Sequence, residues 1–447
     1  MSDTIAALAT ASGVGSVAIV RLSGPKALEI AKKVTKRDSF TPRYAHLNDL
    51  FDKDDQIIDE AIVIYFQAPR SFTTEDVVEF QCHGGSIVAE RILDTVIGLG
   101  ARPAEPGEFT KRAFLGGRID LSEAEAIAKL IEAKSDDAAK ILARQMKGEL
   151  KEFVEDVKER LLRVVAYAEV TIDYAEEDLP DDLVENMLHQ LEELSERMER
   201  IVSSSQRRRG LIEGFKVSIV GKPNVGKSSL LNSLLDYERA IVSSIAGTTR
   251  DTIEEQIRVG SHLVRVVDTA GIRSSEDTIE RIGIERSVTA IEQSDIVVAL
   301  FDASREWDEE DERILSLLER FESEKEIVVA LSKTDLPKRL ERSRVERFAP
   351  LLLNSQNRAD EVLGELERRL SKMAQADELL LVSTRQIDAL KRAQSALKDA
   401  LEPLKAGELE IFSYYLNEAI KAVGSISKPV DFNDIMDRMF GEFCLGK

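Results

Sequence analysis

The sequence contains few cysteines and few histidines. Its 447 residues include two Cys and four His. Two cysteines are too few for a disulfide framework, which predicts a protein of the reducing cytoplasm. Cys82 lies in a strand-like apolar stretch, and we expect it in the core. His83 stands beside two glycines, without the clustered Cys and His ligands that a zinc site requires.

Long apolar runs and an excess of positive charge are also missing. No run of about 18 apolar residues indicates a membrane span, and no apolar N-terminal segment indicates export. The 61 basic and 82 acidic residues leave a net charge of −21. Such a chain repels RNA phosphates unless basic side chains cluster locally or a partner carries the RNA. The sharpest basic run is Arg-Arg-Arg at 207–209; we interpret it as a solvated linker rather than an RNA contact.

A complete phosphate-binding loop lies in the middle of the chain. Residues 221–228 read Gly-Lys-Pro-Asn-Val-Gly-Lys-Ser, after a strand-like run at 215–220 and before a helix-like stretch at 229–235. The two glycines permit a backbone path along which successive N–H groups face the phosphates. Lys227 can then reach the β- and γ-phosphate oxygens, and the Ser228 hydroxyl can bind Mg²⁺. The loop predicts a nucleoside triphosphate site.

Three downstream motifs follow in the order of a GTPase. Gly-Thr-Thr-Arg-Asp at 247–251 supplies Thr249, which can close over Mg²⁺ and the γ-phosphate. Asp-Thr-Ala-Gly at 268–271 follows a strand-like run and supplies the carboxylate of Asp268 near the Mg²⁺. A third strand-like run, 327–331, leads into Ser-Lys-Thr-Asp at 332–335, the position of the base-reading loop. These motifs predict a Ras-like GTPase domain that binds GTP and Mg²⁺.

Three parts of this domain depart from the usual pattern. Base-reading loops normally read Asn-Lys-x-Asp, and this chain has Ser332 in place of the Asn. Loss of one neutral hydrogen bond costs about 0.5–1.5 kcal/mol, so we expect weaker affinity, with guanine preference retained through Asp335. Ile272 occupies the position of the water-orienting glutamine, so a carboxylate of 273–286 must replace it. Asn-Ser-Gln at 354–356 is the candidate for the last base-contacting loop.

Motifs on both sides of the GTPase segment indicate a family. Residues 77–85 read Val-Val-Glu-Phe-Gln-Cys-His-Gly-Gly, residues 105–112 read Glu-Pro-Gly-Glu-Phe-Thr-Lys-Arg, and the chain ends in Phe-Cys-Leu-Gly-Lys. With Gly-Gly-Arg-Ile-Asp-Leu-Ser-Glu-Ala-Glu-Ala at 116–126, the sequence resembles the MnmE, or TrmE, family of tRNA modification GTPases. The resemblance covers essentially the whole chain, with the motifs in the same order.

The resemblance implies a potassium-activated GTPase. Glu280, in Glu-Arg-Ile-Gly-Ile-Glu at 280–285, would be the catalytic glutamate; the alternative is a solvated, salt-bridged helix face. K⁺ would replace an arginine finger and offset charge near the β–γ bridging oxygen, in a site completed when two GTPase domains meet. The implied K⁺ ligands are Asn224, Ser243, Ile245 and Thr248, and the implied Mg²⁺ ligands are Ser228 and Thr249.

The implied catalytic set is Glu280, Lys227, Thr249 and Cys444. For Cys444, an inert cysteine in the tail is the alternative to a functional thiol. The implied GTP contacts are Asn224, Val225, Gly226, Lys227, Ser228, Ser229, Ser243, Ser244, Ile245, Ala246, Gly247, Thr248, Thr249, Asp268, Thr269, Ala270, Gly271, Ser332, Lys333 and Asp335.

The same resemblance implies a folate site in the N-terminal part. A 5-formyl- or 5,10-methylene-tetrahydrofolate would contact Arg21, Glu79, Arg118 and Lys447. Guanidinium and carboxylate groups suit the amide-like edge of a pterin and its glutamate tail. At Arg118 the family often has lysine, which keeps the charge and changes the geometry.

The implied function is addition of a carboxymethylaminomethyl or aminomethyl group at C5 of the wobble uridine, position 34, of certain tRNAs. The implied partners are a second copy of the chain, in a homodimer, and the FAD protein MnmG, or GidA, in a heterotetramer. The tRNA would bind mainly through that partner. Two alternatives stay open: an RNA- or ribosome-associated switch GTPase without modification chemistry, and a dimer scaffold with a degenerate nucleotide site.

Periodicity predicts a multidomain protein of α+β and α/β class. An N-terminal α/β domain for folate binding and dimerisation is expected at 1–118. Apolar residues then recur at three- and four-residue spacing, as at Leu150, Phe153, Val154 and Val157, which is typical of helices. An all-α domain is therefore expected at 119–210 and 377–447, interrupted by an inserted P-loop GTPase domain at 211–376.

Overall fold

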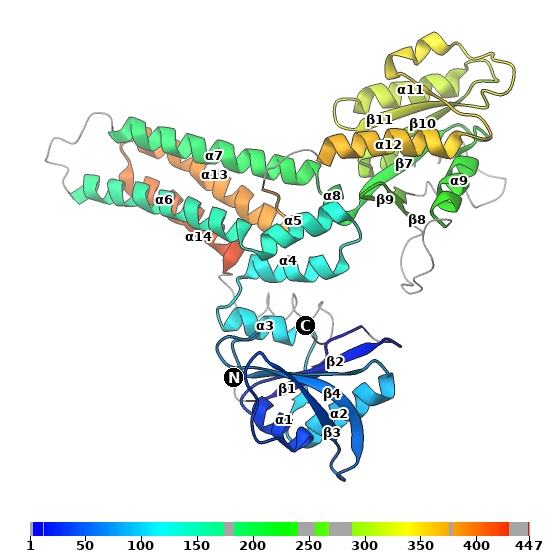
Figure 1. The fold of residues 1–447 in the computed structure, drawn as a ribbon. Coiled ribbons are helices and arrows are strands. Elements are labelled where there is room, and N and C mark those ends of the chain that lie inside the picture. Colours follow the sequence, from blue (N-terminus) through cyan, green and yellow to red (C-terminus); the bar gives the residue numbers. More distant parts are fainter. Residues whose placement is uncertain are drawn as a thin grey trace. The chain divides into compact units, whose positions relative to one another are not determined.

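Two compact units make up the chain. The computed structural model describes residues 3–11, 13–173, 183–239, 255–267, 288–374, 379–428 and 446, and Figure 1 traces their helices and strands. One unit comprises 1–129, 144–196 and 388–447, and the other comprises 130–143 and 197–387. The four-part division drawn from the sequence remains a prediction.

A six-stranded sheet forms the N-terminal part of the first unit. Its strands are β1 (Ile5–Leu8), β2 (Val17–Ser23), β3 (Ala45–Phe51), β4 (Ile57–Phe66), β5 (Val77–His83) and β6 (Arg102–Pro103). They lie in the order β3-β4-β5-β2-β1-β6, and only the β1–β6 pair is parallel. α1 (Ala27–Thr35) and α2 (Ser86–Gly98) contact this sheet, and α3 (Glu108–Leu115) follows it.

Alternation along the strands gives this sheet a covered face and an open face. Ala18, Val20 and Leu22 of β2 are buried in one cluster with residues of α1 and α2. Side chains of a strand alternate between its two faces, so Val17, Ile19 and Arg21 lie on the opposite face. We call it the open face, although its part over β1 is covered, because Ile5 and Ala7 are buried in a cluster with Phe109 of α3. Cys82 is 2% exposed within the covered cluster, and burial raises the pKa of its thiol. The expectation of a core cysteine is confirmed.

Long helices form the remainder of the first unit and link it to the second. They are α4 (Leu121–Glu132), α5 (Asp136–Met146), α6 (Glu149–Asp173), α7 (Leu183–Arg207), α13 (Thr384–Ala406) and α14 (Leu409–Ser427). α6 packs against α14. The apolar positions that predicted α6, among them Phe153, Val157 and Leu161, are all buried. Every helix in the described ranges is too short or too polar to cross a lipid bilayer.

The second unit contains a second six-stranded sheet. Its strands are β7 (Phe215–Gly221), β8 (Glu255–Val259), β9 (His262–Val267), β10 (Ile296–Asp302), β11 (Glu326–Ser332) and β12 (Leu351–Leu352). The order is β12-β11-β10-β7-β9-β8, and all neighbours are parallel except β8 and β9. The helical elements of this part are α8 (Gly210–Glu213), α9 (Lys227–Arg239), α11 (Glu309–Phe321), α12 (Arg358–Ala374), η1 (Arg342–Arg344) and η2 (Glu346–Phe348).

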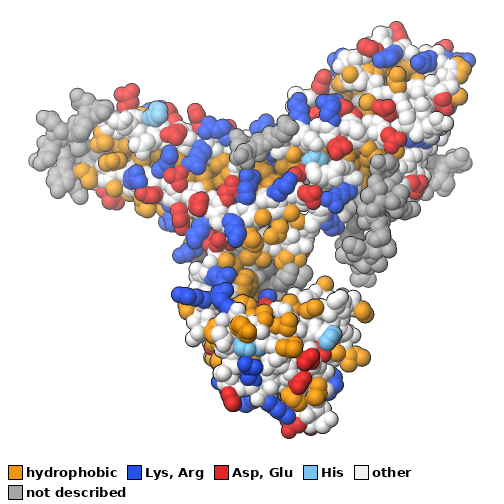
Figure 2. Space-filling view, viewed as in Figure 1, with side chains coloured by type: hydrophobic (Ala, Val, Ile, Leu, Met, Phe, Trp, Pro, Cys, Tyr) orange, Lys and Arg blue, Asp and Glu red, His pale blue; other side chains and the backbone are white. Residues whose placement is uncertain are grey.

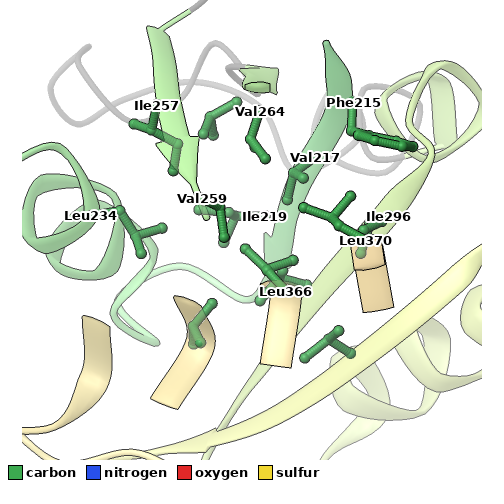
Figure 3. Packing of buried hydrophobic residues seen from close by; sticks show 14 of the residues in the cluster. Phe215, Val217, Ile219, Leu234, Ile257, Val259, Val264, Ile296, Leu366 and Leu370 are labelled. Carbon is green, nitrogen blue, oxygen red and sulfur yellow. The ribbon is translucent and has the colours of Figure 1, made fainter. Parts of the chain in front are cut away.

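Separate apolar clusters cover the two faces of this sheet. Figure 3 shows Val217 and Ile219 of β7 packed with Leu234 of α9 and Leu366 of α12. On the other face, Val220 of β7 is buried in a cluster with Leu318 of α11. Burial on both faces explains why these strands read as nearly continuous apolar runs in the sequence.

The strand order places a binding edge at the carboxyl end of β7. β7 has β9 as its neighbour on one side and β10 on the other, so the chain crosses from one side of β7 to the other between β9 and β10. Ligands of open α/β sheets bind outside the carboxyl ends of the strands, where the order reverses in this way. The predicted phosphate loop and base-reading loop follow β7 and β11, so both start at this edge.

Candidate active site

The loop after β7 departs from ordinary backbone geometry at three positions. Gly221 and Gly226 have φ angles of 152° and 111°, and Asn224 has a φ of 61°. A Cβ at residue 221 would lie 2.6 Å from the carbonyl oxygen of Leu300 in β10. Only glycine therefore lets the loop begin this close to the neighbouring strand. The loop enters α9 at Lys227, where the first N–H groups of a helix lack partners within it and favour an anion.

The Lys227 side chain folds back to the first two residues of the phosphate loop. Its Nζ donates to the carbonyl oxygens of Gly221 at 2.7 Å and Lys222 at 2.8 Å. Burial lowers the pKa of Lys227 because it disfavours the charged ammonium group. A nearby anion would act in the opposite direction and favour the charged form. An ammonium group has three N–H donors, which leaves one for a phosphate oxygen. Ser228, the next residue, is exposed at the same helix terminus.

Lys222 anchors the phosphate loop to α11. Its Nζ donates to Asp308 Oδ2 at 2.7 Å and to Asp311 Oδ2 at 2.6 Å. Burial disfavours the charged form of Lys222, but the hydrogen bonds and charges of the two aspartates outweigh it and raise its pKa. The Lys222 and Asp311 side chains are only 9% and 2% exposed. A buried ion pair therefore fixes the start of the loop.

The predicted base-reading loop is hydrogen-bonded directly to the predicted phosphate loop. Ser332, the last residue of β11, donates from Oγ to the carbonyl oxygen of Val225 at 2.7 Å. Lys333 donates from Nζ to the carbonyl oxygen of Asn224 at 2.9 Å and to Asp302 Oδ2 at 2.6 Å. Burial alone would raise the pKa of Asp302, but hydrogen bonds from Lys333 and Ser304 lower it, which keeps the carboxylate charged. Asp335, two residues beyond Lys333, is exposed.

The candidate for the last base-contacting loop lies beside this one. Thr334 donates from its backbone N–H and from Oγ1 to the carbonyl oxygen of Leu353, at 3.1 Å and 2.9 Å. Asn354 Oδ1 accepts from the N–H groups of Gln356 and Asn357, which forms the turn before α12. The structure thus brings 332–335 and 354–356 together, while their contacts with a base stay predictions.

A large part of the predicted site lies outside the described residues, and the roles of these residues stay predictions. They are Ser243, Ser244, Ile245, Ala246, Gly247, Thr248, Thr249, Asp268, Thr269, Ala270, Gly271, Glu280, Cys444 and Lys447.

A second candidate site lies on the open face of the N-terminal sheet. Arg21 of β2 is directly opposite Glu79 of β5, and its Nε donates to Glu79 Oε1 at 2.9 Å. The Arg21 guanidinium carbon lies 5.8 Å from the centre of the Phe72 ring. The Arg118 guanidinium carbon lies 5.7 Å from the same ring, and Arg118 donates to the carbonyl oxygen of Ser71. Three of the four predicted folate-contacting residues therefore converge around Phe72.

Gly446 is described by itself and lies against the same sheet. Gly446 has a φ of 90°, and a Cβ there would lie 2.1 Å from the carbonyl oxygen of Leu8 in β1. Ala7, the neighbour of Leu8, pairs with Arg21 across the β1–β2 register. This places residue 446 one strand away from the predicted folate contacts.

Two features of these sites escaped the sequence reasoning. The anchor of Lys222 was missed, although Asp308 and Asp311 form a capping box at the start of α11 and so carried a recognisable helix-start signal. Phe72 was missed because a single aromatic residue beside polar ones gives no pattern. Only the fold shows that two predicted arginines share its ring.

Comparison with known proteins covers both sites. The description "GTP-binding protein TrmE N-terminus" matches residues 4–118, and "MnmE helical domain" matches residues 121–444. The tRNA modification GTPase MnmE of Sulfurovum sp. (strain NBC37-1) is 59% identical over 100% of this chain and 99% of that protein. The protein of the same description from Sulfurimonas denitrificans is 58% identical over 100% of this chain and 99% of its own length. A crystal structure of Era from Aquifex aeolicus aligns with 41% of this chain and 66% of that chain at 24% identity, with a TM-score of 0.25, which is too low to support an inference.

Proposed function

This chain belongs to the family of the tRNA modification GTPase MnmE, and we propose that it is a potassium-activated GTPase acting with an FAD-dependent partner on the wobble uridine of certain tRNAs. The reaction adds a carboxymethylaminomethyl or aminomethyl group at C5 of that uridine. The GTPase part of this proposal rests on two hydrogen bonds, which Ser332 and Lys333 donate to carbonyl oxygens of the phosphate loop. They hold a base-reading loop and a phosphate loop at one edge of one sheet.

The described residues suit GTP and Mg²⁺. The N-terminus of α9 offers backbone N–H donors, Lys227 offers an ammonium group, and the exposed hydroxyl of Ser228 is the first Mg²⁺ ligand. Asp335 accepts hydrogen bonds from the donor edge of guanine. Thr249 and Asp268 complete the Mg²⁺ environment in this proposal.

Hydrolysis depends on Glu280 and on K⁺. Ile272, at the position of the usual glutamine, has no group that can orient the attacking water. Glu280 takes this role in the proposal. Asn224 binds K⁺ together with Ser243, Ile245 and Thr248. The left-handed backbone of Asn224 and the bond of its carbonyl oxygen to Lys333 fix the position of this residue. K⁺ supplies positive charge where the β–γ bond breaks.

The open face of the N-terminal sheet binds the one-carbon carrier. Glu79 accepts from the amide-like edge of the pterin, while Arg21 and Arg118 bind its carboxylate tail or stack on its flat ring. The Phe72 ring gives the pterin an apolar surface beside both arginines. Lys447 joins this set from the chain end, next to Gly446. The folate supplies the carbon that is transferred to uridine.

The same face supports a homodimer. Leu47 of β3 and Ile62 of β4 are directly paired and are 62% and 39% exposed. Val17 of β2 is 55% exposed on this face, and Figure 2 shows hydrophobic side chains gathered on the N-terminal part. Apolar side chains in neighbouring strands of an open sheet face favour burial against another copy of the protein.

The charge distribution supports a partner that carries the tRNA. On the face visible in Figure 2, Lys and Arg side chains alternate with Asp and Glu rather than forming one basic surface. Of the basic run at 207–209, Arg209 pairs with Glu213 at 2.8 Å, and Arg207 donates to the Ser203 carbonyl oxygen. The partner in this proposal is the FAD protein MnmG, in a heterotetramer.

Steady-state GTP hydrolysis in K⁺ and in Na⁺ at equal ionic strength tests the proposal. Strong stimulation by K⁺ is expected, and Glu280→Ala should abolish it. Equal and negligible rates in both salts would indicate a degenerate nucleotide site. Brisk hydrolysis that is indifferent to the cation would instead favour an RNA-associated switch GTPase, and a failure of residues 1–118 to bind a tetrahydrofolate would support that alternative.

A further inference from the structure

The single hydroxyl proton of Ser332 is used in a hydrogen bond within the protein. Its side chain is buried, and Oγ lies 2.7 Å from the carbonyl oxygen of Val225 and 3.2 Å from that of Phe301. A hydroxyl group carries one hydrogen, so it donates to one of these acceptors, and the shorter contact is the one to Val225. Neither arrangement leaves a donor for a bound base.

Guanine presents two chemically different edges. N1–H and the N2 amino group are donors, whereas N7 and O6 are acceptors. The carboxylate of Asp335 only accepts hydrogen bonds, so it reads the donor edge on the six-membered ring. Ribose is attached to N9 of the five-membered ring of guanine. If the phosphates lie in the phosphate loop, this ring with its N7 is therefore nearer to Ser332, which is bonded to that loop, while the six-membered ring is nearer to Asp335.

An asparagine at this position could donate a hydrogen bond to the phosphate loop and another to the base. Its amide has two N–H donors, so one can bind the Val225 carbonyl oxygen while the other reaches the base. Serine keeps the bond to the phosphate loop and loses the bond to the base. Two of the three N–H donors of Lys333 Nζ are used by the Asn224 carbonyl oxygen and by Asp302, so a contact of its third donor with N7 is the alternative that the analogue comparison tests.

We propose that Ser332 is a specificity-determining residue that leaves guanine N7 unread, so that recognition of the base rests on its donor edge through Asp335. This inference rests on the proposed function, because it refines the guanine site of the same GTPase. It makes the enzyme tolerant of guanine nucleotides altered at N7. It also makes Ser332 a positioning residue for the phosphate loop.

Nucleotide analogues test this on the unmodified chain. Calorimetric titration would compare GDP with 7-deaza-GDP, which lacks N7, and with IDP, which lacks the N2 amino group. We expect 7-deaza-GDP to bind within about twofold of GDP. IDP should bind about 10- to 150-fold more weakly, because a hydrogen bond to the charged carboxylate of Asp335 is lost. A loss of about fivefold or more with 7-deaza-GDP would overturn the proposal.

Variants at residue 332 separate its two roles. Ser332→Asn should gain discrimination against 7-deaza-GDP of about 2- to 10-fold. Ser332→Ala should weaken GDP and 7-deaza-GDP equally, since it loses only the bond to Val225, and Ser332→Thr should restore that loss. Discrimination that persists in Ser332→Ala would contradict the assignment. If a variant fails to fold, the analogue comparison on the unmodified chain still decides.

A failure of the proposed function would look different. It would appear as no measurable binding of GDP, or as equal binding of GDP and ADP, on the unmodified chain. Asp335→Asn provides a further check of the donor edge, because xanthine carries a carbonyl in place of the N2 amino group. We expect this variant to prefer XDP over GDP, whichever way the N7 comparison turns out.

Discussion

At the scale of single residues, the position of the phosphate loop depends on Lys222, whose charge is paired with two aspartates of α11. Lys222 and Asp311 form an almost fully buried pair, and Asp308 joins it from the cap of α11. Removing one member of a buried pair leaves the other charge without compensation and costs about 3–5 kcal/mol, whereas replacing both with apolar groups is often close to neutral. We therefore expect the largest loss of stability when only one residue of the buried pair is replaced.

We predict that Lys222→Met lowers the melting temperature of the second unit and weakens GDP binding. The double variant Lys222→Met, Asp311→Leu should recover much of the melting temperature, because no buried charge remains. Arg313→Met is the matched control, since its contact with Glu309 is 3.7 Å long and both side chains are exposed; it should change stability by less than about 0.5 kcal/mol. Calorimetry compares all three, and equal effects of Lys222→Met and Arg313→Met would contradict the account.

Gly446 gives a second prediction at this scale. A side chain there meets the Leu8 carbonyl oxygen at 2.1 Å on a backbone with φ of 90°, so Gly446→Ala should displace the chain end from β1. Tetrahydrofolate affinity should fall and β1 amides should exchange hydrogen faster. Gly364→Ala, in α12 with no atom within 4 Å of the added Cβ, should change neither. Unaltered exchange in Gly446→Ala would show that the tail does not need this contact.

At the scale of elements, the segment before and at the start of α5 is attached to the β8–β9 hairpin. Asp137 lies 3.0 Å from both Ser261 Oγ and His262 Nδ1, and Asp136 lies 3.1 Å from Arg258. Lys134 donates to Gln256 at 2.9 Å. These contacts explain why residues 130–143 belong to the second unit, although α5 continues into the first.

The pH dependence of stability should report on the burial of His262 in this hairpin. Burial lowers the pKa of His262 below its ordinary 6.5, although Asp137 and Glu367 act in the opposite direction. The unfolded chain then binds a proton at higher pH than the folded chain, so the stability is complete above about pH 6.5 and is lost as the pH falls below it.

We predict that the melting temperature of the second unit falls between about pH 7.5 and about pH 5.5, and that His262→Gln makes this decline shallower. The exposed His189 is the control, and His189→Gln should leave the slope unchanged. Calorimetry across this range measures all three proteins. Parallel slopes for the unmodified chain and His262→Gln would contradict the assignment.

Elements were predictable where local pattern determines them. The run at 327–331 predicted β11 because a strand buried on both faces is apolar throughout, and the phosphate-loop glycines predicted the turn after β7. The partners of side chains were not predictable, because they are distant in sequence. Asp308 and Asp311 lie 86 and 89 residues from Lys222, and Val225 lies 107 residues from Ser332. The sequence showed a missing amide at 332, but only the fold showed what the hydroxyl does instead.

At the scale of the whole molecule, charge sets what the chain can bind alone. A net charge of −21, with basic and acidic side chains interspersed on the face that Figure 2 shows, opposes the counterion release that drives RNA binding. We predict that this chain alone binds tRNA no more tightly than about 10⁻⁶ M at physiological salt, the range of non-specific binding. Addition of the FAD partner should tighten binding strongly in filter-binding assays. Nanomolar binding without the partner would contradict the prediction.

Reconstitution of the modification reaction tests the central claim most directly. The purified chain, the FAD partner, tRNA, a tetrahydrofolate one-carbon donor, GTP and K⁺ would be combined, and the wobble nucleoside would be analysed by mass spectrometry. We expect the added mass on uridine 34 only in the complete mixture, and its loss when Na⁺ replaces K⁺ or when Glu280→Ala replaces the unmodified chain. Modified uridine formed equally well without GTP hydrolysis, or potassium-stimulated hydrolysis that leaves uridine 34 unchanged in the complete mixture, would contradict the account.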